Sequence, residues 1–194
     1  EAMRMKRELF VQGSGPEPAP SRELFGIERS AKAIKIARRT GGRFASADFF
    51  DVEPVAIAPR RRFPREPRTT HHGLRTKILS GFDAIIGNPP YIRQEVIGAR
   101  DKRRIEACLS RDREASPEIF WPRWSGRSDI YVYFFAHSIR FLKHGGRLVF
   151  LTASSWLDAG YGSALREFLL NNFRIIAVAE SAAETFFTDA SINQ

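Results

Sequence analysis

The sequence predicts an α/β fold in which a mostly parallel sheet carries helices on both faces. Short apolar segments typical of strands alternate with segments whose apolar residues have helical spacing, and this alternation is characteristic of parallel sheets. Of the 194 residues, 43% are hydrophobic, which is enough for a substantial core. The length is within the usual range for one domain.

The first part of the chain contains two predicted strands joined by a helix. Leu24–Glu28 is a short apolar strand that ends in an acid, and Arg43–Ala47 is a second strand, followed by Asp48. Ser is a favoured N-cap residue, so Ser30 is expected to begin a helix that extends to about Arg39. The apolar residues at helical spacing in this segment are Ala33, Ile34 and Ala37.

The second part of the chain begins with a strand, Phe82–Gly87, which ends at Asn88-Pro89-Pro90-Tyr91. Proline has no backbone N–H, so two prolines cannot continue a hydrogen-bonded ladder and the chain must leave the sheet there. Four further elements are expected: a helix over Asp129–Lys143, a buried strand over Leu148–Leu151, a helix over Ser163–Asn171 and a strand over Phe173–Ala179. Gly145-Gly146 is expected to end the first helix.

Two long segments interrupt this rhythm, residues 52–80 and residues 93–127, and both are interpreted as insertions that leave the sheet. Long insertions in compact domains are usually functional or disordered. The stretch 60–77 is strongly basic, so it is either a phosphate-contacting segment or a solvated loop. Its cationic residues are Arg60, Arg61, Arg62, Arg65, Arg68, Arg75 and Lys77.

The overall charge and the few cysteines limit the classes of function. The formal net charge of +9 favours a polyanionic partner such as nucleic acid over a merely basic surface. Cys108 is the single cysteine, which excludes a disulfide framework and fits a reducing cytoplasm. His71-His72 and His144 lack partners at ligand spacing, so no metal site is predicted. No apolar run approaches the roughly 18–20 residues that span a bilayer.

Asn88-Pro89-Pro90-Tyr91 is the strongest chemical signal because it directly follows an apolar strand. In open parallel sheets, ligands bind beyond the carboxyl ends of the strands. The prolines fix the backbone, so a main-chain carbonyl and the Asn88 amide can point at one spot. Two such acceptors would bind the hydrogens of an exocyclic amine and favour a free lone pair, while Tyr91 offers a flat face for a base. An ordinary turn after a strand is the alternative.

The stretch FDAIIGNPPY (Phe82–Tyr91) resembles the hallmark motif of Rossmann-like amino-methyltransferases, which use S-adenosylmethionine. The resemblance implies that Asn88, Pro89, Pro90 and Tyr91 form the catalytic motif. LFGIE (Leu24–Glu28) resembles the strand whose closing acid, here Glu28, holds the ribose hydroxyls of the cofactor. ASADFFD (Ala45–Asp51) resembles the next element, in which Asp48 meets the cofactor adenine amine and Phe49 stacks on its ring. Asp51 is the rival of Asp48 for this role.

The segment Asp129–Phe173 resembles restriction–modification methylases that fuse or pair with an endonuclease, and its Gly160-Tyr161-Gly162 narrows the resemblance to this DNA-acting, Type IIG-like branch. Phe134 matches an aromatic residue that lines the cofactor pocket, or it is a core residue of its helix. AETFFTDASIN (Ala183–Asn193) resembles the segment whose aromatic residue packs against the flipped base, so Phe187 is expected to bind substrate together with Tyr91. Phe186 is the alternative to Phe187.

The family's Gly-rich cofactor loop has no counterpart in the sequence. Gly13-Ser14-Gly15 is rejected because the three prolines Pro16, Pro18 and Pro20 follow it instead of a helix. We therefore expect residues 1–194 to be a partial catalytic domain whose first strand and glycines lie upstream of Glu1. No target-recognition domain is visible, and an endonuclease domain is possible outside this segment.

Together the motifs predict a site-specific DNA methyltransferase that transfers a methyl group from S-adenosylmethionine to adenine N6 in double-stranded DNA. Three rival functions stay open at the level of sequence. A related RNA base methyltransferase and a protein-glutamine methyltransferase would use a similar Asn-Pro-Pro-Tyr site. A fragment that binds nucleic acid through its charge without turnover is the non-catalytic rival.

Overall fold

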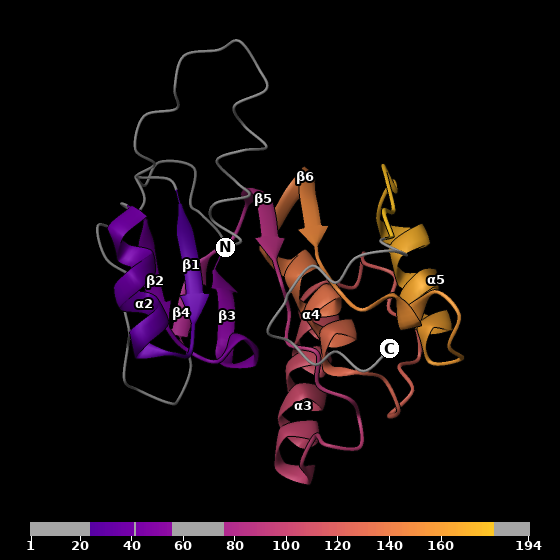
Figure 1. Cartoon of the computed structure of the whole chain (residues 1–194). Coiled ribbons are helices and arrows are strands. Elements are labelled where there is room, and N and C mark those ends of the chain that lie inside the picture. The colour runs from indigo at the N-terminus through magenta and orange to yellow at the C-terminus, as the bar shows by residue number, and fades with distance from the viewer. Residues whose placement is uncertain (1–23, 41, 56–75, 181–194) are drawn as a thin grey trace.

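The computed structural model describes residues 24–40, 42–55 and 76–180 (Figure 1). Its strands form three parallel pairs: β1 (Phe25–Glu28) with β2 (Arg43–Ser46), β3 (Val52–Val55) with β4 (Thr76–Leu79), and β5 (Phe82–Gly87) with β6 (Leu142–Phe150). The α-helices are α2 (Ala31–Ala37), α3 (Ala99–Ala115), α4 (Ile130–Ser138) and α5 (Gly162–Asn172). Short 3-10 turns are η1 (Arg38–Thr40), η2 (Phe49–Asp51), η3 (Ile139–Phe141) and η4 (Ser154–Trp156).

The unit formed by β1, α2 and β2 agrees closely with the sequence prediction. Ser30 is the N-cap of α2, and its hydroxyl accepts a hydrogen bond from the Ala33 N–H at 3.2 Å. The two strands pair in register from Phe25 opposite Arg43 to Glu28 opposite Ser46. Their carboxyl ends therefore meet at the same edge.

The β3–β4 pair was not expected, because it lies at the two ends of the predicted insertion 52–80. Val52 pairs with Thr76 and Val55 pairs with Leu79. β3 contains Pro54, a residue that is found in strands mainly at sheet edges and bulges. The two ends of the predicted insertion 52–80 are therefore neighbouring strands of one parallel pair.

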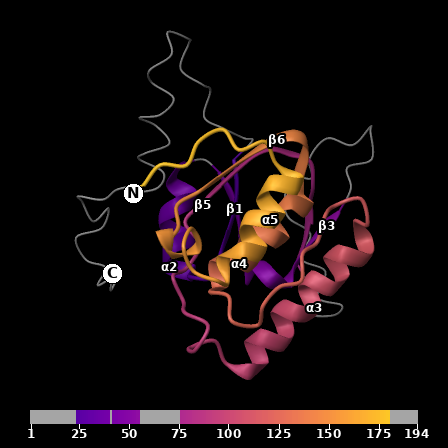
Figure 2. The ribbon, with the colours of Figure 1, turned by 90° about the vertical axis from the view of Figure 1, so that its right-hand side faces the viewer.

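The β5–β6 pair supports the Asn-Pro-Pro-Tyr loop, and α4 and α5 cover it on one side (Figure 2). The register places Ile85 opposite Leu148 and Gly87 opposite Phe150. The Phe135 ring of α4 meets the Phe150 ring edge-on at 4.8 Å between centroids. On the other side of the molecule α2 covers the β1–β2 pair (Figure 1). The parallel pairing agrees with the prediction, whereas the described strands form three separate pairs and not one continuous sheet.

Two predicted boundaries around β6 were wrong. α4 ends at Ser138 instead of Lys143, and β6 begins at Leu142, six residues before the predicted strand. Pairing with β5 explains the difference, because Phe82 pairs with Leu142 and the register then shifts before Ala84 pairs with Arg147. Gly145 and Gly146 therefore lie in an irregularity of the strand, where Gly145 adopts a φ of 75°.

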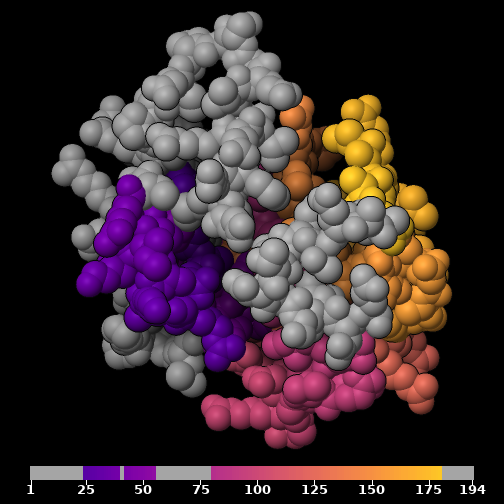
Figure 3. Space-filling model, viewed as in Figure 1, coloured from indigo at the N-terminus to yellow at the C-terminus, as the bar shows by residue number. Residues whose placement is uncertain are grey.

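The predicted strand Phe173–Ala179 was also wrong. In the described part of the chain β6 pairs only with β5, so no neighbouring strand gives residues 173–179 a ladder. The segment lies on the surface (yellow in Figure 3) and exposes apolar side chains. The exposed ones are Ile175, Ile176 and Val178.

The insertion 93–127 contains the 17-residue helix α3, which packs on α4. Ile105, Cys108 and Leu109 of α3 form one core cluster with Phe50 and Tyr133. A second cluster joins α4 to α5, and a third joins β2 and β3 to Phe141. No helix in the described ranges is long and apolar enough to cross a membrane.

Candidate active site

The Asn-Pro-Pro-Tyr loop begins directly after β5, as the sequence predicts. Asn88 is exposed, whereas Pro89 is buried and anchors the turn. The half-buried Tyr91 donates its hydroxyl proton to the Leu151 carbonyl oxygen at 3.3 Å. Burial raises the pKa of Tyr91 above its ordinary value of 10.0. The loop is thereby tied to the strand end next to it, and the Asn88 side chain is left accessible.

Glu28 lies at the carboxyl end of β1, half-buried, where a ligand of the sheet edge would approach. Its Oε1 accepts a hydrogen bond from the Ser30 N–H at 2.8 Å. This contact fixes the carboxylate beside the first turn of α2. The predicted role of Glu28 is to bind hydroxyl groups, for which an ionised carboxylate supplies acceptors.

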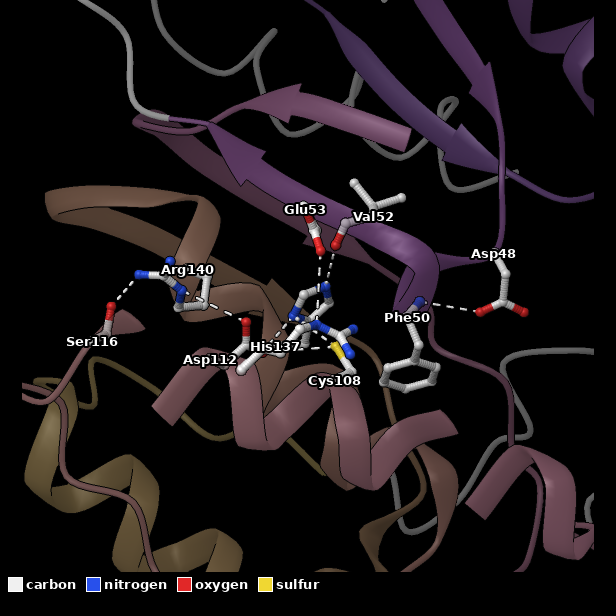
Figure 4. A network of polar contacts seen from close by, with 10 residues as sticks. Asp48, Phe50, Val52, Glu53, Cys108, Asp112, Ser116, His137 and Arg140 are labelled. Carbon is white, nitrogen blue, oxygen red and sulfur yellow. Dashed lines mark hydrogen bonds and ion pairs between the residues drawn. The ribbon is translucent and has the colours of Figure 1, made fainter. Parts of the chain in front are cut away.

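Asp48 follows β2, and its carboxylate is already engaged within the chain. One oxygen accepts from the Phe50 N–H at 3.1 Å and so caps η2 (Figure 4). The other forms ion pairs with Arg104 at 3.0 Å and with the exposed Arg29 at 3.2 Å. Arg104 also pairs with Asp51 at 3.3 Å, so one guanidinium of α3 joins both rival acids.

Phe49 and Phe134, the two predicted cofactor-lining aromatics, lie against each other. Their rings stack at 5.0 Å between centroids with an interplanar angle of 16°. The buried Phe50 ring meets the Phe134 ring edge-on, with 4.9 Å between the ring centroids. The aromatic pair thus joins η2 to α4, next to Asp48.

The predicted site residues fall into two groups in the structure. Glu28 and Asp48 follow the neighbouring strands β1 and β2, and Phe49 and Phe134 continue from Asp48. Asn88–Tyr91 follows β5, whose Phe82 stacks on Phe25 of β1 at 6.1 Å. The arrows of β1, β5 and β6 point the same way in Figure 1, so both groups lie at carboxyl ends. Phe187, Phe186 and the basic residues 60–75 lie outside the described residues.

The comparison with known protein families decides which family carries this arrangement. A model of the Eco57I restriction-modification methylase family matches residues 22–187, which include both strand-end acids and the Asn-Pro-Pro-Tyr loop. The chain belongs to the Eco57I restriction-modification methylase family.

Curated relatives agree with the family. The Eco57I-family chain is 32% identical over 179 residues to the Type II methyltransferase M.XamI of Xanthomonas campestris pv. amaranthicola, covering 91% of this chain and 30% of that protein. It is 34% identical over 143 residues to M.TthHB8I of Thermus thermophilus, covering 74% of this chain and 31% of that protein. It is 31% identical over 94 residues to M.BstVI of Geobacillus stearothermophilus, covering 48% of this chain and 15% of that protein. The chain therefore spans under a third of the length of these relatives.

This Eco57I-family chain contains a buried polar network of Cys108, Asp112 and His137 that the sequence did not predict (Figure 4). His137 Nδ1 lies 2.6 Å from Asp112 Oδ2, and its Nε2 lies 3.1 Å from the Val52 carbonyl oxygen. Cys108 Sγ lies 3.4 Å from the same Nδ1. All three side chains are buried. The Cys108–Asp112 spacing of four residues on one helix was a usable signal, but nothing in the sequence pairs it with His137.

The three side chains are of types that bind metal ions, and their ligand atoms lie within 4.8 Å of one another. Each is already used by a hydrogen bond, however. Arg140 Nε lies 3.6 Å from the other Asp112 oxygen, and Arg140 also donates to the Ser116 hydroxyl. A cation beside Asp112 opposes a second one by repulsion. We interpret the cluster as a hydrogen-bonded network that fastens α3 and α4 to β3.

Proposed function

We propose that this chain contributes the catalytic core of a Rossmann-like, S-adenosylmethionine-dependent DNA methyltransferase that modifies adenine at N6 within a restriction–modification system. The observation that carries the proposal is the loop Asn88–Tyr91, held by a buried Pro89 and a tethered Tyr91 at the end of β5. The Eco57I-family match, the Type II methyltransferase names of the relatives and the net charge of +9 support DNA as the substrate.

The chemistry follows from the donor and acceptor inventory of the loop. The exposed Asn88 amide oxygen is an acceptor for one hydrogen of an adenine amine, and a main-chain carbonyl of the rigid turn is the second acceptor. Holding both hydrogens favours a pyramidal nitrogen with an available lone pair. Because the acceptors are fixed before the substrate arrives, little reorganisation is needed in the transition state. The base has to leave the duplex to reach this loop.

The residues at the strand ends fit the cofactor by their chemistry. When bound, S-adenosylmethionine supplies an activated methyl group. Glu28 would accept from its ribose hydroxyls. A carboxylate accepts about four hydrogen bonds, and Asp48 accepts two and forms an ion pair with Arg29, so it retains a site for the adenine amine. Phe49 and Phe134 are already in stacking contact, so the adenine would lie on the outer side of the pair.

Cofactor binding is tested by equilibrium dialysis of the chain with labelled S-adenosylmethionine. Glu28→Gln keeps the shape of the side chain but weakens the acceptor, and loss of a charged hydrogen bond costs about 1.5–3 kcal/mol. We expect binding to weaken by that amount while DNA affinity stays the same. The exposed Glu167→Gln of α5 is the matched control. An unchanged cofactor affinity in Glu28→Gln would refute the ribose role.

The acceptor class is tested by a competition assay. The protein containing this chain is incubated with labelled S-adenosylmethionine and three substrates: duplex DNA, structured RNA and bacterial protein extract. We expect label in the DNA alone. Label confined to RNA or to protein would overturn the proposal in favour of the corresponding rival methyltransferase.

A further inference from the structure

Asp129 occupies the N-cap position of α4 but does not cap that helix with its side chain. Aspartate at this position normally accepts a hydrogen bond from a backbone N–H of the first helical turn. Here one carboxylate oxygen accepts from the Gln94 N–H at 3.2 Å, and the other accepts from the Tyr161 hydroxyl at 2.9 Å. The Asp129 side chain therefore binds the backbone of a loop residue, Gln94, that lies 35 residues earlier in the chain.

A second contact ties the same loop to the same helix end. The Ile130 N–H, which has no acceptor within its own helix, donates to the Ile92 carbonyl oxygen at 3.0 Å. Ile92 and Gln94 are the first and third residues after Tyr91. The segment that follows the Asn-Pro-Pro-Tyr motif is therefore held at two backbone positions by the N-terminus of α4.

Tyr161 holds Asp129 in turn. A carboxylate only accepts, so Tyr161 must donate its proton to Asp129 and can accept from the hydroxyls of Ser155 at 2.7 Å and Tyr131 at 3.0 Å. Hydrogen bonds arranged head to tail in this way reinforce one another. A Cβ atom at Gly162 would overlap the Trp156 carbonyl oxygen, so glycine is required for the approach that places Tyr161.

The contacts form a closed path around the catalytic loop. Tyr91 is tied to Leu151 at the end of β6, and Ser155 of η4 lies in the loop that follows Leu151. Tyr161 and Asp129 complete the path back to Gln94. The C-terminal end of the motif is thus anchored twice, through Tyr91 itself and through Gln94, which Asp129 holds.

We propose that Asp129 is a positioning residue that sets the conformation of the Asn88–Tyr91 loop through the Gln94 backbone, and that Tyr161 orients Asp129. The inference rests on the proposed function, because its consequence is for methyl transfer. Asp129 contacts the segment after the loop and acts on the acceptor geometry of Asn88, separately from the proposed cofactor residues Glu28 and Asp48.

The first test separates turnover from binding. Asp129→Ala removes both hydrogen bonds, and a misplacement of about 1 Å in a catalytic group costs about 100-fold in rate. We therefore expect kcat to fall by that order while the KM for S-adenosylmethionine changes little. Asp129→Asn keeps an acceptor for the Gln94 N–H and is expected to restore part of the rate. The control is Asp158→Ala, an exposed acid in the loop after η4.

The second test does not depend on activity. Hydrogen exchange of the Gln94 amide is expected to accelerate in Asp129→Ala and to stay as in the parent in Asp158→Ala. An unchanged exchange rate, an unchanged kcat, or equal losses of kcat and cofactor affinity would overturn the positioning role. If the parent protein transfers no methyl group, the proposed function fails, whereas the exchange rate still decides whether Asp129 holds the loop.

Discussion

The buried pair of Asp112 and His137 allows a sharp prediction about stability. The Asp112 side chain is 6% exposed and lies 2.6 Å from His137 Nδ1 and 3.6 Å from Arg140 Nε. Asp112→Ala leaves the buried His137 without its hydrogen-bond partner and Arg140 without its ion-pair partner, and removing one member of a buried pair costs about 3–5 kcal/mol. A domain of this size has about 5–15 kcal/mol of stability in total, so we expect a large loss.

Urea unfolding followed by far-UV circular dichroism measures this loss. Asp112→Asn keeps the shape and one acceptor, so it is expected to cost only about 1–3 kcal/mol. Glu114→Ala, an exposed residue of the same helix, is the matched control and is expected to change stability by at most about 0.5 kcal/mol. If Asp112→Ala were within about 1 kcal/mol of the parent, the network would not fasten α3 and α4 to β3 as inferred.

Three further predictions concern the motif, the tyrosines and the basic segment. Asn88→Ala removes an acceptor that matters mainly in the transition state, so the activation free energy of methyl transfer is expected to rise by about 3–4 kcal/mol with little change in cofactor binding. Loss of both cofactor binding in dialysis and activity in transfer assays would make Asn88 a structural residue. Burial raises the pKa of Tyr91, Tyr131 and Tyr133 above the ordinary 10.0. Because the folded state holds these protons more tightly, their contribution to stability is complete below pH 10.0 and is lost as the pH rises through the folded pKa values. An absorbance titration should show delayed ionisation in the native protein, and native and unfolded curves that coincide would reject the burial. Replacing Arg60, Arg61, Arg62, Arg65 and Arg68 by Ser is expected to flatten the salt dependence of DNA binding by about 0.9 per lost phosphate contact, whereas a slope identical to the parent would favour a solvated loop.

Local signals in the sequence were sufficient for the β1–α2–β2 unit and for β5. The Ser30 cap, the strand ends at Glu28 and Asp48 and the departure of the chain at Pro89 each depend on residues a few positions apart. For the same reason the sequence placed Glu28, Asp48 and the Asn88–Tyr91 loop at strand ends, where the structure has them, while their roles stay predictions. The family resemblance assigned Phe49 and Phe134 separately to the cofactor pocket, but their contact with each other was not predicted, because the two residues are 85 positions apart.

The elements that the sequence missed depend on distant partners. β4 exists because Thr76–Leu79 pairs with β3, and β6 begins early because Leu142 pairs with Phe82. The segment 173–179 has strand-like composition but no described neighbour to pair with. Likewise Asp129 was predicted only as the start of a helix, and its contacts with Gln94 and Tyr161 depend on residues 35 and 32 positions away. Pairing and burial across the chain, rather than propensity, decide these cases.

The central claim is that the Asn88–Tyr91 loop directs methyl transfer to the exocyclic nitrogen of adenine in DNA. The most direct measurement is mass analysis of nucleosides from duplex DNA that has been incubated with the protein containing this chain and S-adenosylmethionine. We predict N6-methyladenine in the parent reaction and its loss in the Asn88→Ala reaction. Methylcytosine as the only modified nucleoside would contradict the claim.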